Sequence, residues 1–157
     1  MFIKDFEVRW SDLDANGHLA NSAYVNFMSH TRMAFLTQVG FSYETLGKNT
    51  LGPVVFYEHL YYFKEVLPGV PVRVSLELAG MSEDGTFFEF LHKFFDPDGK
   101  NIARCEMMGA WIDLKSRKLS PLPEEFLNQF KGMERAENFR WLKPEDTRAH
   151  GRRPEHL

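Results

Sequence analysis

Residues 12–24 gather many polar groups into a short stretch of the chain. The order is Asp12-Leu13-Asp14-Ala15-Asn16-Gly17-His18-Leu19-Ala20-Asn21-Ser22-Ala23-Tyr24. A carboxylate can act as a general base or a nucleophile, and an imidazole can orient water or protonate a leaving group. With main-chain N–H groups that hold negative charge, these are the parts needed to attack a carbonyl. The spacing alone is equally consistent with an ordinary turn that caps a helix.

This polar stretch lies between a strand-like run and a helix-like run. Residues 2–10 alternate imperfectly and predict a strand, whereas the apolar side chains of residues 22–39 recur at helical spacing. We expect Asn21 or Ser22 to cap the helix and Gly40 to end it. Unpaired N–H groups and the helix dipole then favour negative charge at the start of the helix.

Other chemistries fit the sequence less well. Residues 12–17 match the first half of a calcium loop, but Ala23 stands where that loop needs a glutamate. The six histidines are scattered, without HExxH or CxxC spacing, so we expect no metal site and no cofactor. There is no glycine-rich phosphate loop and no GxSxG elbow. Cys105 is interpreted as a small core residue.

The remaining pattern predicts an α+β fold in which an antiparallel sheet of about five strands packs around one long helix. Strands are expected over residues 54–66, 70–78, 88–94 and 102–114, and the short turns between them favour antiparallel neighbours. We place one domain over residues 1–122. Residues 123–157 are expected to form a short helix over 124–133 and a polar tail.

Composition narrows the possible partners and compartment. The chain has 157 residues and a formal net charge of −3, so it offers no basic field for nucleic acid. A single cysteine suits a reducing compartment, and no signal peptide is visible. Apolar runs fall far short of the ~18 residues of a membrane-spanning helix. We therefore expect a cytoplasmic protein that binds neither nucleic acid nor membrane.

The element order and the polar stretch together resemble the hotdog-fold acyl-CoA and acyl-ACP thioesterases. Residues 12–24 are similar to the D-x-D-x-N-x-H-x-x-N-x-x-Y signature of that family, and the resemblance covers roughly residues 3–120. It implies that Asp14 is the nucleophile or the general base, and that Asn16 and His18 are catalytic. Some bacterial relatives carry a histidine where Asn21 stands. The nucleophile and water routes both remain open.

The same resemblance suggests where the rest of a site would lie. A thioester carbonyl would meet the N–H groups near Asn21 and Ser22, where one donor is typically worth about 10²–10³ in rate. Glu65 or Glu58 could supply a second carboxylate, although a solvated strand residue is the simpler interpretation. Arg104 and residues 115–118 could meet CoA phosphates, but such charges are typical of a solvated surface.

The acyl group is the least constrained feature. The expected substrate-pocket residues are Tyr24, Phe56, Tyr57, Tyr61 and Trp111. Aromatic faces attract quaternary ammonium groups, so one hypothesis is a small trimethylammonium acyl group such as that of betainyl-CoA. The alternative is that these rings only pack in the core.

The resemblance also implies an assembly and leaves other activities open. The expected partners are an acyl-CoA or acyl-ACP substrate and a second copy of the chain, as a homodimer or a dimer of dimers. A hotdog hydratase or dehydratase acting on acyl thioesters, and a non-catalytic acyl-CoA-binding domain, remain as alternative functions.

Overall fold

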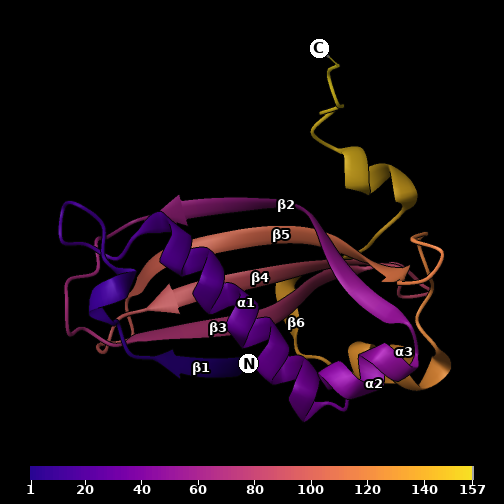
Figure 1. Ribbon diagram of the computed structural model, residues 1–157, viewed down its shortest axis with the longest axis horizontal. Coiled ribbons are helices and arrows are strands. Elements are labelled where there is room, and N and C mark those ends of the chain that lie inside the picture. The colour runs from indigo at the N-terminus through magenta and orange to yellow at the C-terminus, as the bar shows by residue number, and fades with distance from the viewer. Residues whose placement is uncertain (157) are drawn as a thin grey trace.

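A single sheet packs against a long helix, α1, that crosses one of its faces (Figure 1). The structure is a computed structural model that describes residues 1–156; Leu157, at the end of the expected tail, lies outside the described residues. Five antiparallel strands lie in the order β1-β3-β4-β5-β2. Their bounds are Phe2–Phe6 (β1), Leu51–Tyr62 (β2), Val72–Met81 (β3), Phe87–Phe95 (β4) and Asn101–Asp113 (β5). The expected α+β architecture with about five antiparallel strands is confirmed.

Alternation along the strands explains which face is buried. In β3 and β4, every second side chain joins the main core under α1, and these are Val72, Val74, Leu76, Leu78, Phe88, Phe90 and Phe94. Side chains of successive strand residues point to opposite faces, so a continuous apolar set on one face forms a core. His92 belongs to the same strand face and is fully buried.

The central helix α1 (Asn21–Gln38) buries the side that faces the sheet. Tyr24, Phe27, Met28 and Leu36 are among its buried residues. The helix ends before Gly40, whose φ of +92° is the left-handed conformation that glycine adopts without strain. The predicted helix is therefore confirmed to within one residue at each end.

The start of the chain departs from the predicted strand. β1 ends at Phe6, and Trp10 lies in a short 3-10 helix, η1 (Trp10–Asp12), where 90% of its surface is exposed. The carboxylate of Asp12 accepts the main-chain N–H of Arg9 at 2.9 Å. This local hydrogen bond closes a turn, and the turn competes successfully with extension of the strand.

The edge strand β2 changes face halfway along its length. Its pairing with β5 is interrupted between Val55 and Tyr57, which leaves Phe56 as an extra residue. Before this bulge Val55 faces α1, whereas after it Leu60 joins the core under α1 and Tyr57 packs on the opposite, outer face. A β-bulge reverses the alternation of side chains beyond it.

Two short helices also contribute to the core. The first, α2 (Tyr43–Lys48), follows α1, and the second, α3 (Glu124–Lys131), lies within the expected terminal helix. Phe126 and Phe130 of α3 contact Phe41, with ring centroids 4.3 and 5.7 Å apart. Phe126 and Phe130 therefore belong to the main core under α1.

One strand lies within the region that the sequence predicts as a polar tail. β6 (Arg135–Trp141) pairs in parallel with β3, at the part of β3 that extends beyond β1. It is followed by a short 3-10 helix, η2 (Pro144–Arg148). Five of the seven β6 side chains are exposed, so the strand shows little alternation between apolar and polar residues in the sequence.

None of the helices within residues 1–156 combines the length and apolar character needed to cross a membrane.

Candidate active site

The loop between η1 and α1 is closed by main-chain hydrogen bonds. Leu13 and Leu19 form an antiparallel bridge, and Asp14 N–H donates to the carbonyl of His18 at 2.8 Å. Gly17 adopts a φ of +72°, which allows the tight return. The loop is thus a small hairpin that carries Asp14 and His18 on adjacent positions.

The two aspartates of this loop have different roles in the structure. Asp12 is 7% exposed and receives both the Nε and an Nη of Arg9, at 3.0 and 2.9 Å. This hydrogen bonding to Arg9 holds the pKa of Asp12 below its usual value. Asp12 therefore anchors the loop, and the exposed carboxylate of Asp14 is the one available for chemistry.

Asp14 is oriented by its own loop. Its Oδ1 accepts the main-chain N–H groups of Asn16 and His18, at 2.8 and 3.1 Å. Both hydrogen bonds go to one oxygen, and no protein group within residues 1–156 donates to Oδ2. One carboxylate oxygen is thus held by the loop, and the residue lines a cleft. Asn16 thus acts on Asp14 through its main-chain N–H group.

His18 has a carboxylate partner from a distant part of the sequence. Its Nε2 lies 3.3 Å from Oε2 of Glu65, in the segment that follows β2. The N–H of Leu19 donates to the carbonyl of Val66 at 2.9 Å and keeps the two segments together. The imidazole is therefore held between the loop and Glu65.

The first turn of α1 lies beside the same groups, since Asn21 lines a cleft together with Asp14 and His18. The helix is capped by Ala20, not by Asn21 or Ser22 as the sequence predicts, because Asn21 and Ser22 already have helical conformation. Alanine has no side-chain acceptor, so Ala20 makes no side-chain cap to the first-turn N–H groups. Uncapped N–H groups at a helix start suit an oxyanion.

These groups meet at one open cleft, which we call the Asp14 cleft, with a volume of about 380 Å³. Its lining comprises Asp14, His18, Leu19, Asn21, Tyr24, Tyr62, Phe63, Lys64 and Glu65. Tyr24 and Tyr62 meet edge to face with ring centroids 5.0 Å apart. Burial raises the pKa of Tyr24 to about 12, so its hydroxyl remains protonated at neutral pH. The cleft thus joins an exposed carboxylate, an imidazole and a helix start.

Several other expected site residues do not reach this cleft. Ser22 is exposed beside it without lining it. Tyr61 is 47% exposed on β2, and Phe56 and Tyr57 line a separate pocket on the outer face of the sheet. The predicted common aromatic pocket is therefore not assembled within the described chain, because Phe56 and Tyr57 lie on the outer face of the sheet, whereas Tyr24 on α1 lines the Asp14 cleft.

Trp111 and Glu58 lie instead beneath α1. Trp111 is fully buried and lines an apolar cavity of about 190 Å³ between α1 and the sheet. The ring nitrogen Nε1 of Trp111 has no hydrogen-bond partner within the described residues. Glu58 Oε1 lies 3.4 Å from Arg32 Nη1 on α1, so this carboxylate is paired rather than placed as the second acid of the Asp14 cleft.

Arg32 also belongs to a buried polar network that the sequence analysis does not identify. Nε2 of His92 lies 3.4 Å from Arg32 Nη1, and Nδ1 lies 2.8 Å from the carbonyl of Ser75. A carbonyl only accepts, so Nδ1 carries the proton and Nε2 faces the guanidinium. Burial, with the nearby Arg32 charge, lowers the pKa of His92 to about 3.

A signal for this network is present in the sequence. Arg32 follows Met28 by four residues, which places a cation on the inward side of α1, and His92 alternates with phenylalanines on one strand face.

Cys105 is nearby and fully buried, and burial raises the pKa of its thiol to about 12. Its expected role as a core residue is confirmed, since a protonated buried thiol is a poor nucleophile. Within residues 1–156 no cluster of three or more His, Cys, Asp or Glu could hold a metal ion.

A family profile and a curated relative that resemble this chain both describe thioesterases. The profile of the thioesterase-like superfamily matches residues 8–130. Over 127 residues the chain is 22% identical to the chloroplastic acyl-acyl carrier protein thioesterase ATL3 of Arabidopsis thaliana. That match covers 80% of this chain and 65% of the relative, so the chain spans less than two thirds of that relative's length.

Solved structures share the fold at low sequence identity. A Staphylococcus aureus hypothetical protein in complex with CoA matches with a TM-score of 0.78 and 19% identity, covering 99% of this chain and 95% of that one. The DHNA-CoA thioesterase of Staphylococcus aureus matches with a TM-score of 0.73 and 19% identity, covering 82% and 85% of the two chains. These likenesses confirm the hotdog architecture that the family resemblance implies.

The buried histidine generates a prediction for stability. The ordinary pKa of histidine is 6.5 and that of folded His92 is about 3, so between these values the unfolded chain binds a proton that the folded chain excludes. Stability therefore falls as pH decreases through this window, by up to about 1.4 kcal/mol per pH unit from this group. His92→Gln removes that contribution, so its stability should depend less steeply on pH than that of the wild type.

Urea denaturation of both proteins from about pH 7 to about pH 5 measures the difference in slope. His30→Gln, at an exposed position of α1, is the matched control. Equal slopes for wild type and His92→Gln would contradict a neutral, buried imidazole.

Proposed function

Because the chain belongs to the thioesterase-like superfamily, we propose that it hydrolyses an acyl-CoA thioester to a free acid and CoA at the Asp14 cleft. The observation that carries this proposal is the convergence of the Asp14 carboxylate, His18 and the uncapped start of α1 on one cleft. Acyl-ACP is the other carrier that the family resemblance allows.

The proposed reaction places the thioester carbonyl oxygen against the first-turn N–H groups, near Asn21 and Ser22. These groups hold the negative charge that develops when the carbonyl carbon is attacked. Asp14 either removes a proton from the attacking water or attacks the carbon itself and is regenerated by hydrolysis. In both routes the carbon–sulfur bond breaks, and the departing thiolate takes a proton.

His18 is proposed to donate that proton to the departing thiolate. Its Nε2 faces Glu65 at 3.3 Å, so the carboxylate can hold the ring in one orientation. The second carboxylate of the site is thus Glu65 in this proposal, and Asn16 is a positioning residue that acts on Asp14 through its N–H.

Replacement of Asp14 tests the central step. Asp14→Asn keeps the size and the acceptor for the Asn16 and His18 amides but removes the charge, so turnover should fall by about 10²–10⁴. Thiol release from a panel of acyl-CoAs measures it, with thermal unfolding as the check on folding.

Asp98→Asn, an exposed aspartate in another turn, is the matched control and should retain wild-type turnover. Wild-type turnover by Asp14→Asn would remove Asp14 from the mechanism. Hydration of crotonyl-CoA without thiol release would favour a hydratase, and ligand-dependent stabilisation without turnover would favour a binding domain.

For the acyl group, we retain a small trimethylammonium acyl group as the specific proposal. The Asp14 cleft offers the rings of Tyr24, Tyr62 and Phe63 together with the Glu65 carboxylate. Aromatic faces and a carboxylate both attract a quaternary ammonium group. Among the rings that the sequence analysis assigned to the pocket, Tyr24 is the one that lines this cleft.

Two isosteric substrates test that charge preference. Betainyl-CoA and 3,3-dimethylbutanoyl-CoA differ in nitrogen against carbon at the branch point and have nearly the same shape. At about 0.5–2 kcal/mol per ring, two rings should give betainyl-CoA at least a fivefold advantage, about fivefold to several hundredfold, in kcat/KM. Equal kcat/KM values would contradict a cation-binding cleft.

We also propose that the protein assembles as a homodimer or a dimer of dimers. β2 ends the sheet, and its pairing with β5 leaves its other edge without a strand within residues 1–156. Val55, Phe56, Tyr61 and Tyr62 on this strand are all more than 40% exposed. An exposed apolar edge strand tends to pair with another chain.

Light scattering coupled to size-exclusion chromatography measures this assembly. The mass at micromolar concentration should be two or four times that of the 18.3 kDa chain. A monomeric mass at every concentration tested would contradict the proposal.

A further inference from the structure

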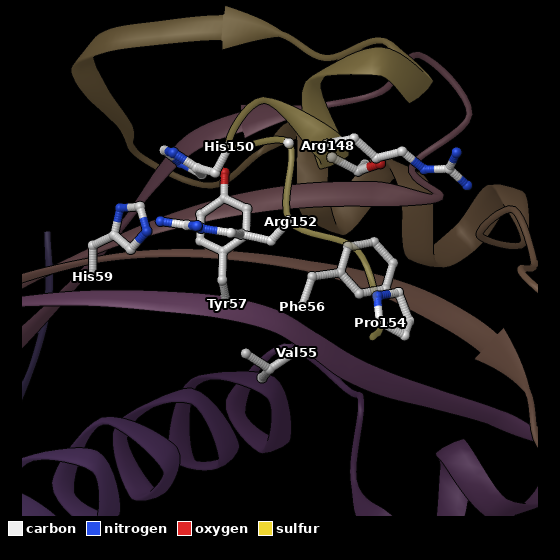
Figure 2. Close-up of a pocket in the computed structure, with 10 residues that line it drawn as sticks. Val55, Phe56, Tyr57, His59, Arg148, His150, Arg152 and Pro154 are labelled. Atoms are coloured by element: carbon white, nitrogen blue, oxygen red, sulfur yellow. The ribbon is translucent and has the colours of Figure 1, made fainter. Parts of the chain in front are cut away.

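A second, larger hollow lies on the outer face of the sheet, away from the Asp14 cleft. It is formed where the C-terminal segment after β6 returns over β2, and its volume is about 690 Å³ (Figure 2). Its lining comprises Val55, Phe56, Tyr57, His59, Thr147, Arg148, His150, Gly151, Arg152 and Pro154. We call it the arginine pocket. Its volume lies within the ~300–1,000 Å³ range of small-molecule sites.

The charge of this pocket is one-sided. Its charged lining residues are Arg148 and Arg152, and two imidazoles, His59 and His150, accompany them without any acidic residue in the lining. Neither arginine forms an ion pair with another residue of the described chain. The net charge of the whole chain is −3, so a purely cationic lining is a local feature. It favours an anionic ligand.

Three acidic residues of the outer face have partners outside the pocket. Glu89 and Asp146 bind Arg140, at 3.1 and 3.0 Å, and Glu106 binds Arg104 at 2.9 Å. Glu145 lines a neighbouring hollow together with Arg148, so Arg152 is the arginine farther from an acidic residue of that hollow. Arg104, considered from the sequence as a phosphate contact, is occupied by this pairing.

Aromatic rings gather beside the arginines. Tyr57 and His59 stack with centroids 4.9 Å apart, and His150 meets His59 at 4.4 Å. Figure 2 shows Arg152 reaching toward Tyr57 and His59, whereas Arg148 extends away from them. Phe56 is 44% exposed at the other end of the pocket. Flat rings beside guanidinium groups suit a ligand that joins an aromatic base to phosphates.

We propose that the arginine pocket binds an adenine nucleotide that carries at least two phosphate groups. The rings of Phe56, Tyr57 and His59 offer surfaces for the base, and Arg148 and Arg152 are the phosphate ligands. Arginine is suited to phosphate because its planar donors form two parallel hydrogen bonds.

This ligand chemistry has two sources. One is the phosphorylated adenosine of CoA itself, in which case the pocket deepens the proposed function by selecting CoA over a carrier protein. From Tyr57 to Tyr62, which lines the Asp14 cleft, β2 extends about 17 Å at 3.3 Å per residue, a distance comparable to the arm that joins the nucleotide of CoA to its thiol. The other source is a free nucleotide that acts as an effector.

The test uses two thioesters of the same acyl group, one on CoA and one on pantetheine, which lacks the nucleotide. Arg152→Ala should lower the ratio of kcat/KM for acyl-CoA to kcat/KM for acyl-pantetheine by roughly tenfold to a hundredfold, as expected for a lost charged hydrogen bond. The ratio cancels any general loss of folded enzyme. Arg153→Ala, next in the chain but outside the lining, is the matched control and should keep the wild-type ratio.

Calorimetric titration with adenosine 3′,5′-bisphosphate measures the pocket directly. The bisphosphate should bind the wild type and the Arg153→Ala control, and bind Arg152→Ala at least about tenfold more weakly. A lowered substrate ratio together with this loss identifies CoA as the source. An unchanged ratio with the same loss identifies a free nucleotide.

Equal binding by the wild type and Arg152→Ala, or no binding by the wild type, overturns the nucleotide site. Failure of the proposed function is a separate result. If the wild type hydrolyses neither thioester, the thioesterase proposal is wrong, while the titration still decides whether the pocket binds a nucleotide.

Discussion

Two main-chain N–H groups, of Asn16 and His18, hold one oxygen of the Asp14 carboxylate, and the geometry of the candidate site follows from that pair of hydrogen bonds. Because both donors belong to the loop that carries Asp14, the loop orders its own functional group without help from a distant side chain. The pairing of buried Asp12 with exposed Arg9 then fixes the loop to the turn that precedes it. One aspartate serves anchorage and the other remains open to a ligand. The hairpin ends at Leu19, which is hydrogen-bonded to Val66 and lies directly before α1, so His18, Glu65 and the start of the helix lie close together.

β2 connects the Asp14 cleft, the cavity under α1 and the arginine pocket. Tyr62 lines the Asp14 cleft, Val55 borders the cavity under α1, and Tyr57 with His59 forms the floor of the arginine pocket. An edge strand can serve several sites because its side chains alternate between faces and its outer edge is not covered by another strand of the same chain. The buried Arg32–His92 contact lies behind the same strand, paired through Glu58. β2 thus carries residues of the ligand-binding hollows and also the Glu58 carboxylate that pairs with Arg32 behind the strand.

The sequence predicted the features that depend on local periodicity. The span of α1, the alternating faces of β3 and β4 and the place of the polar loop before the helix were all readable, and the structure confirms them. Features that depend on neighbours distant in the chain were not readable. Ala20 caps the helix because the preceding hairpin sets its backbone, and a single extra residue at Phe56 reverses the alternation of the side chains that follow it in β2. β6 escaped detection because a largely exposed strand carries little alternation. The pairing of His18 with Glu65 needs the loop after β2 to fold back, which only the tertiary structure specifies.

The extra residue at Phe56 gives β2 one place where the chain can be shortened without exchanging its two faces. Val55 and Tyr57 already face opposite sides of the sheet, and they pair with consecutive residues of β5, Gly109 and Met108. Removing Phe56 would therefore restore regular pleating and leave Leu60 in the core. Removing a residue between Tyr57 and Leu60 would instead turn Leu60 toward solvent. Divergent copies of the chain should therefore lose a residue at the bulge more readily than elsewhere in this strand.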